Sequence, residues 1–206
     1  MTFDNTAQCD LWIINPETNK PKTKRKKRPR KYLTYDEVQI LRKGAKKSKR
    51  NARRNDFIIL FMFTHGLRVE ELIKTRWDQL DLDNALFHVE RVKNGINSVH
   101  PLITEEIRYL TALKKKNLTN IYVFENERKV PFSNRAIYEI IEKAGKYTNL
   151  PFSINPHMLR HSCGFYLINK GMDIRMLQTF LGHVKVENTA HYSVVDYKRY
   201  GKYLEK

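Results

Sequence analysis

Side chains that could act together on one substrate are concentrated in the C-terminal part of this 206-residue sequence. A His-x-x-Arg-His cluster contributes His157, Arg160 and His161, a Gly-His pair ends at His183, and Tyr192 stands nine residues after it. Positions three apart share one face of a helix, so His157 and Arg160 would point together, with His161 one turn further along. Cations, hydrogen-bond donors and a phenol on one surface could bind and attack an anionic group.

The histidines of this cluster also admit a structural and a metal-binding interpretation. Taken singly, a histidine near the start of a helix is usually a capping or core residue. His157 and His161 also have the i, i+4 spacing of a helix-borne zinc pair. The intervening Glu of a metalloprotease helix is missing, however, and Arg160 would place a fixed cation beside the metal. We therefore predict no metal at this cluster.

Three residues in the first half of the chain could complete the site. Arg68 follows a glycine at which a helix can end, and Glu71 stands three residues further on. This is either a routine surface ion pair or a carboxylate that orients an arginine toward a ligand. Lys93, in a Lys-Asn-Gly turn, is by itself an ordinary hairpin lysine.

Together these residues form the set that phosphodiester chemistry requires. Arginines and histidines can neutralise charge on the non-bridging oxygens, an acid can protonate the leaving oxygen, and a tyrosine can attack. The sequence shows no carboxylate cluster that would hold Mg²⁺. The reaction that fits is transfer of a phosphodiester to tyrosine, with no metal and no cofactor.

Hydrophobic periodicity predicts the elements that must position these side chains. FIILFMF (57–63) is apolar on every side, which indicates a buried helix, and LFHVERV (86–92) alternates as a strand does. The predicted fold class is mainly α with a small antiparallel β-sheet (α+β). The sheet should lie within residues 77–102, and helices are predicted at 34–47, 51–64, 67–75, 104–116, 133–146, 156–169, 173–182 and 196–204.

Positive charge is concentrated near the N-terminus. The formal net charge is +17, and Lys and Arg supply nine of the twelve residues 20–31 and eight of the thirteen residues 42–54. Proline and dense charge disfavour compact packing in the first run. We therefore predict a flexible basic arm at residues 1–31 and one folded domain at 32–206.

Basic runs can be solvated surface, but a charge of this size favours a polyanion partner. The residues predicted to contact DNA are Lys22, Lys24, Arg25, Lys26, Lys27, Arg28, Arg30, Lys46, Lys47, Lys49, Arg50, Arg53 and Arg54.

Nothing in the sequence indicates export or membrane insertion. No apolar run approaches the about 18 residues of a membrane span, and the first residues do not form a secretory signal. Cys9 and Cys163 are too few and too far apart for a disulfide framework. We expect a reducing, aqueous compartment, the cytoplasm or bacterial nucleoid, and no membrane partner.

Four motifs resemble, in order and spacing, the signature of the tyrosine recombinase/phage integrase family. They are GLRVEEL (66–72), HMLRH (157–161), LGH (181–183) and Tyr192, so the resemblance covers residues 32–206. NPHMLRHSCGF (155–165) resembles, more narrowly, the short bacterial recombinases that invert fimbrial phase-variation switches. The resemblance implies a tyrosine recombinase catalytic-domain fold and a site-specific DNA recombinase that inverts a DNA element.

The resemblance also implies a role for each matching residue. Tyr192 would be the nucleophile, forming a 3′-phosphotyrosyl link and freeing a 5′-hydroxyl, while Arg68 and Arg160 would clamp the scissile phosphate. Because the covalent link keeps the energy of the phosphodiester, rejoining would need neither ATP nor metal.

Other matching positions would move protons or support the clamp. His157 would act as general acid/base toward the tyrosine, His183 would hydrogen-bond the phosphate, and Lys93 would protonate the departing 5′ oxygen. Glu71 would orient Arg68, and His161 would be structural.

The implied partner is double-stranded DNA with short inverted repeats, bound by a homotetramer on two sites, with accessory DNA-bending proteins as a further partner class. Most of the family carries a separate helical domain before the catalytic one, whereas 31 residues precede it here, as in the fimbrial-switch recombinases. Alternatives are an integrase or excisionase of a mobile element, a catalytically silent DNA-binding regulator, and a type IB topoisomerase.

Overall fold

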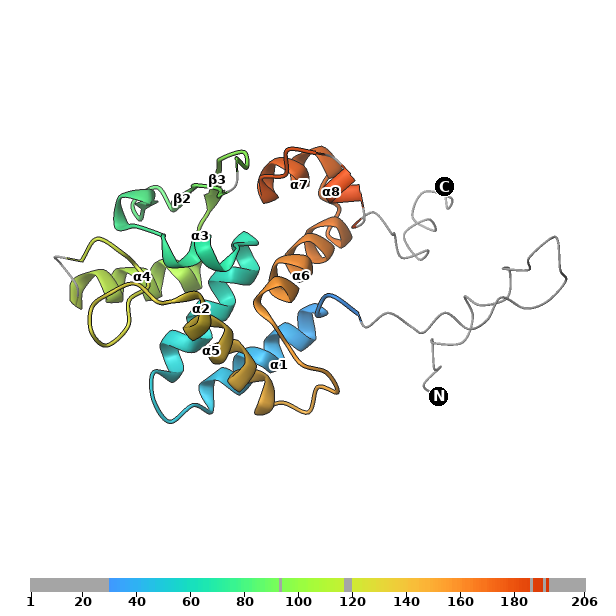
Figure 1. Ribbon diagram of the computed structural model, residues 1–206. Coiled ribbons are helices and arrows are strands. Elements are labelled where there is room, and N and C mark those ends of the chain that lie inside the picture. Colours follow the sequence, from blue (N-terminus) through green and yellow to red (C-terminus); the bar gives the residue numbers. More distant parts are fainter. Residues whose placement is uncertain (1–29, 93, 117–119, 186, 191, 193–206) are drawn as a thin grey trace, which may run out of the picture. The chain divides into compact units, whose positions relative to one another are not determined.

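The computed structural model describes residues 30–92, 94–116, 120–185, 187–190 and 192 (Figure 1). The chain divides into two units, Met1–Arg30 and Lys31–Lys206, and all described helices and strands belong to the second. The helices are α1 (Tyr35–Lys46), α2 (Ala52–His65), α3 (Val69–Ile73), α4 (Thr104–Lys116), α5 (Asn134–Lys146), α6 (Pro156–Asn169), α7 (Ile174–Leu181) and α8 (Glu187–Ala190), with a short 3-10 helix at Trp77–Gln79.

One small antiparallel sheet interrupts the helices. Its strands are β1 (Leu80–Asp81), β2 (Leu86–Val89) and β3 (Ser98–Pro101), in the order β1-β2-β3. Phe87 pairs with His100 across β2 and β3, and both residues are buried. The prediction of a mainly α fold with a small antiparallel sheet is confirmed.

The core is built around α2. Every residue from Phe57 to Phe63 is buried, as the apolar sequence predicts. Helices α1, α4, α5 and α6 all pack against α2, and α5 also packs against α1 and α6 (Figure 1). Burying each large apolar side chain stabilises the fold by about 1.5–3 kcal/mol relative to exposure. The end of α2, where the candidate site begins, is therefore anchored in the hydrophobic core.

Local capping chemistry fixes the helix ends near the site. Asn155 accepts a hydrogen bond from the backbone N–H of Met158 at 3.3 Å and starts α6, with Pro156 at the first helical position. Gly66 and Gly182 end α2 and α7 with φ of +58° and +67°, in the left-handed region that glycine adopts without strain. These ends turn the chain toward the candidate site.

Two features differ from the predictions made from the sequence, and two other predictions fall on residues that the structure does not describe. Helix α3 is shorter than the predicted 67–75, because after Gly66 the backbone of Arg68 is extended (φ −76°, ψ 158°) and caps the helix from outside. Helix α8 was not anticipated. The helix predicted at 196–204 and the arm at 1–31, apart from Arg30 and Lys31, lie outside the described residues and stay predictions.

Candidate active site

Arg68 and Glu71 form a fixed pair at the start of α3. The Arg68 backbone N–H donates to Glu71 Oε2 at 2.9 Å, and the Arg68 guanidinium donates to Glu71 Oε1 at 2.6 Å. The Arg68 side chain keeps 24% of its surface exposed, whereas Glu71 is buried. The carboxylate therefore holds one side of the guanidinium and leaves another side available to a ligand, as the orienting-carboxylate hypothesis requires.

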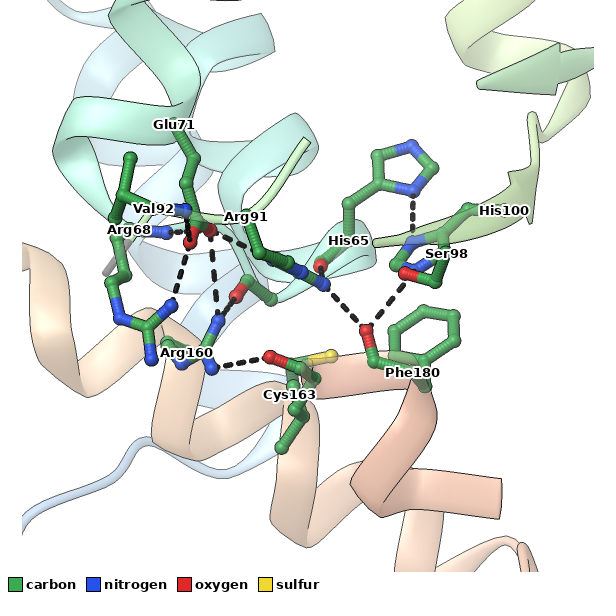
Figure 2. Close-up of polar contacts among 12 residues, drawn as sticks. His65, Arg68, Glu71, Arg91, Val92, Ser98, His100, Arg160, Cys163 and Phe180 are labelled. Atoms are coloured by element: carbon green, nitrogen blue, oxygen red, sulfur yellow. Dashed lines mark hydrogen bonds and ion pairs between the residues drawn. The ribbon is translucent and has the colours of Figure 1, made fainter. Parts of the chain in front are cut away.

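Glu71 is the shared partner of three arginines (Figure 2). Besides Arg68, it accepts a hydrogen bond from Arg91 at 2.7 Å, and Arg160 lies 3.7 Å away. Burial alone would raise the pKa of Glu71, but Arg91, the Arg68 backbone N–H and Arg160 together outweigh it and lower that pKa. Three guanidinium groups around one carboxylate leave an excess of positive charge, which suits a bound anion.

Arg160 joins the C-terminal ends of two helices. It is 5% exposed, and its two terminal nitrogens donate to the carbonyls of Gly66 at 2.5 Å and Leu181 at 2.6 Å. Burial lowers its pKa to about 10, and the neighbouring Arg91 and Arg68 act in the same direction. The group therefore remains cationic at neutral pH, in the negative field of the two helix C-termini.

His183 follows directly after Gly182 and is buried. Its backbone N–H donates to the carbonyl of Gln178 at 2.9 Å, and its Nδ1 lies 2.9 Å from the hydroxyl of Thr189 on α8. The unanticipated helix α8 thus contributes to the site, because its threonine fixes the orientation of the imidazole.

Tyr192 is packed into the same site. Its exposed fraction is 1%, its ring stacks on His183 with 6.5 Å between centroids, and its hydroxyl lies 3.0 Å from Nδ1 of His161. The ring also lies against Gly164, where an added Cβ would come within 2.7 Å of it. Residues from α6 and the segment after α7 therefore converge on the phenol.

The ionisation of Tyr192 reflects this packing. Burial raises the pKa of the phenol to about 12, and the positive charges of Arg160 and Arg68 only partly offset the effect. At neutral pH the hydroxyl is protonated, so attack on a phosphodiester requires a base or a change of surroundings.

Two predicted catalytic residues are not placed in this cluster. His157 is exposed in the first turn of α6, and within the described part of the chain its side chain makes no hydrogen bond or ion pair. Lys93 lies outside the described residues, and the two residues before it in the sequence, Arg91 and Val92, both contact Glu71. The roles of His157 and Lys93 stay predictions.

The predicted DNA-contact residues fall into two groups. Lys22, Lys24, Arg25, Lys26, Lys27 and Arg28 lie outside the described residues, and Arg30 is exposed. The other six lie at the end of α1, in the following loop and in the first turn of α2: Lys46, Lys47, Lys49, Arg50, Arg53 and Arg54.

Within this second group most side chains are exposed. Lys46 pairs with Asp56 at 3.2 Å yet remains more than half exposed. Arg54 is half-buried with its guanidinium over the ring of Phe132, and burial lowers its pKa. Arg42, at the start of the same basic run, is instead buried against Asp56, so the usable positive surface is smaller than the sequence count indicates.

Sequence reasoning missed Arg91, although a signal was present. In the alternating segment LFHVERV, Phe87, Val89 and Arg91 occupy the same side, and all three are buried. An arginine at an inward position of a period-two pattern implies a buried partner, because an unpaired buried cation is strongly unfavourable.

Within the described residues, no helix is long and apolar enough to cross a membrane, and no group of three or more His, Cys, Asp or Glu side chains is placed to hold a metal ion.

Comparison with known proteins agrees with this geometry. The phage integrase family model matches residues 31–199. The type 1 fimbriae regulatory proteins FimB and FimE of Escherichia coli (strain K12) are 34% and 31% identical over 189 and 184 residues, which cover 87% and 86% of this chain and 92% of each relative. A crystal structure of XerA recombinase has a TM-score of 0.72 at 26% identity, covering 85% of this chain and 65% of that one. The chain therefore belongs to the phage integrase family and is a tyrosine-type site-specific DNA recombinase.

Proposed function

We propose that this recombinase inverts a DNA segment between short inverted repeats, as a switch that controls transcription of fimbrial genes. The support is its likeness to FimB and FimE, which extends over 92% of both relatives. Integration or excision of a mobile element by the same chemistry is the alternative. We place the enzyme in the cytoplasm, on the bacterial nucleoid.

Tyr192 is the proposed nucleophile, and Arg68 and Arg160 are the proposed phosphate clamp. The observation that carries this assignment is the convergence of Arg68 and Arg160 on buried Glu71, with Tyr192 close enough for both arginines to act on its pKa. Guanidinium groups can contact two phosphate oxygens at once, which stabilises the charge that develops during transfer. His183, held by Thr189, then donates to the phosphate, and Lys93 protonates the leaving 5′ oxygen.

Two histidines compete for the proton of Tyr192. His157 is the base that the family resemblance implies, but His161 is the imidazole within hydrogen-bond distance of the phenol, at 3.0 Å. We propose to separate them with His157→Gln and His161→Gln in single-turnover cleavage across pH 6–9. The residue that takes the proton is the one whose substitution removes the low-pH limb of the profile.

DNA is proposed to be held by the exposed basic residues around the α1–α2 loop together with the predicted arm at 1–31. Contacts of this kind supply affinity rather than sequence choice, because phosphate contacts position the protein and base contacts specify the site. A homotetramer on two sites, assisted by DNA-bending proteins, is the proposed assembly.

Trapping of the covalent intermediate tests the chemistry. A nicked duplex carrying an inverted repeat from beside the gene should yield a covalent protein–DNA adduct with the wild type and none with Tyr192→Phe. An adduct that persists in Tyr192→Phe would refute the assigned nucleophile. Site binding by the wild type without any cleavage would favour the silent regulator, and relaxation of plasmids that lack the repeat would favour a topoisomerase.

A further inference from the structure

Arg91 is a buried cation at the centre of the site, in contact with Glu71. Its side chain is completely buried, and it stands two residues after the end of β2. Burial lowers the pKa of its guanidinium, and Glu71 opposes that effect. Burying an arginine carries a considerable desolvation penalty, which is offset only where its N–H groups make well-aligned hydrogen bonds and ion pairs.

Arg91 and Arg160 contact the same two helix ends. The backbone carbonyls that Arg91 contacts each precede by one residue the carbonyl that Arg160 contacts. Arg91 Nη2 donates to the carbonyls of His65 at 3.3 Å and Phe180 at 2.5 Å, whereas Arg160 donates to Gly66 and Leu181. Both arginines therefore join the C-terminal end of α2 to that of α7, with Glu71 between them (Figure 2).

Two glycines lie close against the Arg91 side chain. A Cβ on Gly182 would lie 2.5 Å from Arg91 Cγ, and a Cβ on Gly95 would lie 2.8 Å from Arg91 Cβ. The same Phe180 carbonyl is also within 3.1 Å of His100 Nε2, so the end of α7 is held from two sides. The absence of a side chain at Gly95 and Gly182 thus lets Arg91 lie against Gly182, which directly precedes His183.

We propose that Arg91 is a positioning residue for strand cleavage: it keeps Glu71 under Arg68 and fixes the end of α7 that carries His183. This inference rests on the proposed roles of Arg68 and His183. Glu71 Oε2 is shared between Arg91 at 2.7 Å and the Arg68 backbone N–H at 2.9 Å, with Arg160 at 3.7 Å. Without Arg91, the Glu71 carboxylate turns toward Arg160 and neutralises its charge. Arg68 then loses the partner that orients its guanidinium.

Arg91→Lys tests the proposal, with Arg42→Lys as the matched control. One ammonium group cannot reach Glu71 and two carbonyls at once. Arg42 is likewise buried in an ion pair, with Asp56 at 2.8 Å and with Glu105, but on α1 and away from Glu71. Each protein is measured for thermal stability, for affinity to the repeat, and for the rate of single-turnover cleavage of a nicked duplex.

Arg91→Lys should cleave about a hundredfold more slowly than the wild type, as expected for a misplaced clamp, while affinity for the repeat changes less than threefold. A phosphorothioate at the scissile phosphate supplies the second readout. In Arg91→Lys the misplaced Arg68 should contact the non-bridging phosphate oxygen poorly. The ratio of the cleavage rates of the phosphate and phosphorothioate substrates should therefore fall toward one in Arg91→Lys and stay at the wild-type value in Arg42→Lys.

Cleavage of Arg91→Lys within threefold of the wild type would overturn the inference, as would slow cleavage with the wild-type oxygen-to-sulfur ratio, which would show a structural role alone. If Arg91→Lys does not fold, Arg91→Gln, which keeps two N–H donors without the charge, takes its place in the same comparison. Failure of the wild type to cleave would refute the proposed function instead, so the two failures are distinguishable.

Discussion

Replacement of Gly164 by alanine should displace Tyr192 from its buried position. A Cβ at Gly164 would lie 2.7 Å from Cε1 and Cζ and 2.9 Å from Cδ1 of the Tyr192 ring, whereas carbon atoms in contact are normally about 3.5–4.0 Å apart. Gly164 lies within α6, whose backbone hydrogen bonds hold it in place. The ring is expected to move rather than the helix, because a shift of α6 would disturb its packing against α2 in the core.

Two energies oppose each other in Gly164→Ala. Overpacking of this kind costs about 1–3 kcal/mol, which lowers the ratio of docked to displaced ring by about 5- to 150-fold. Alanine stabilises a helix interior by about 1 kcal/mol relative to glycine. The global stability of Gly164→Ala should therefore change little while the position of Tyr192 changes substantially.

Fluorine NMR of 3-fluorotyrosine placed at position 192 measures the displacement. Burial holds the pKa of Tyr192 at about 12, and a solvent-exposed phenol titrates near 10, so Gly164→Ala should lower the measured pKa by about 2. Gly145→Ala is the control, because its Cβ would meet only Ile154, at 3.3 Å. An unchanged pKa and resonance in Gly164→Ala would refute the packing argument.

The same variant tests what the buried position means for cleavage. With 1% of Tyr192 exposed, the phenol has to leave this position before it meets a phosphodiester. Cleavage of a nicked repeat by Gly164→Ala should therefore be no slower than by the wild type. Slower cleavage would show that the ring attacks from the position described.

Three other perturbations have defined expected outcomes. Burial is the main cause that lowers the pKa of His100 to about 2, so stability that is present above pH 6.5 is lost as the pH falls toward 2. In urea unfolding, the difference in stability between the wild type and His100→Gln should shrink by about 2 kcal/mol from pH 7.5 to pH 5.0. A constant difference would contradict that pKa. Gly182→Ala should lower the free energy of unfolding by about 1–3 kcal/mol more than Gly171→Ala. Both glycines have positive φ, but a Cβ at Gly182 would lie 2.5 Å from Arg91, whereas nothing lies within 4 Å of a Cβ at Gly171. Equal decreases in the two variants would mean that the clash with Arg91 is relieved. Deleting residues 1–31 should flatten the plot of log K against log salt by about 0.9 for each phosphate that the arm neutralises, and an unchanged slope in a binding titration would place the arm away from DNA.

The sequence by itself determined the motifs and most of the described elements, although not α8 or the length of α3. Local chemistry is sufficient for this: Asn155 starts α6 by accepting from a backbone N–H three residues away, and Gly66 and Gly182 end helices through their own backbone freedom. The spacing from His183 to Tyr192 is likewise readable along the chain, and the family match confirms the resemblance that it carries.

Only the tertiary structure decided which of these side chains meet. Glu71 contacts Arg91 across 20 residues and His161 meets Tyr192 across 31, and neither contact follows from a local period. The reason is physical: a buried charge or phenol is tolerated only where a partner from a distant segment offsets its desolvation, and the sequence pattern records the burial without naming the partner. Arg91 is the clearest case, because its inward position was visible in the strand pattern while its role depended on two helix ends brought together by folding.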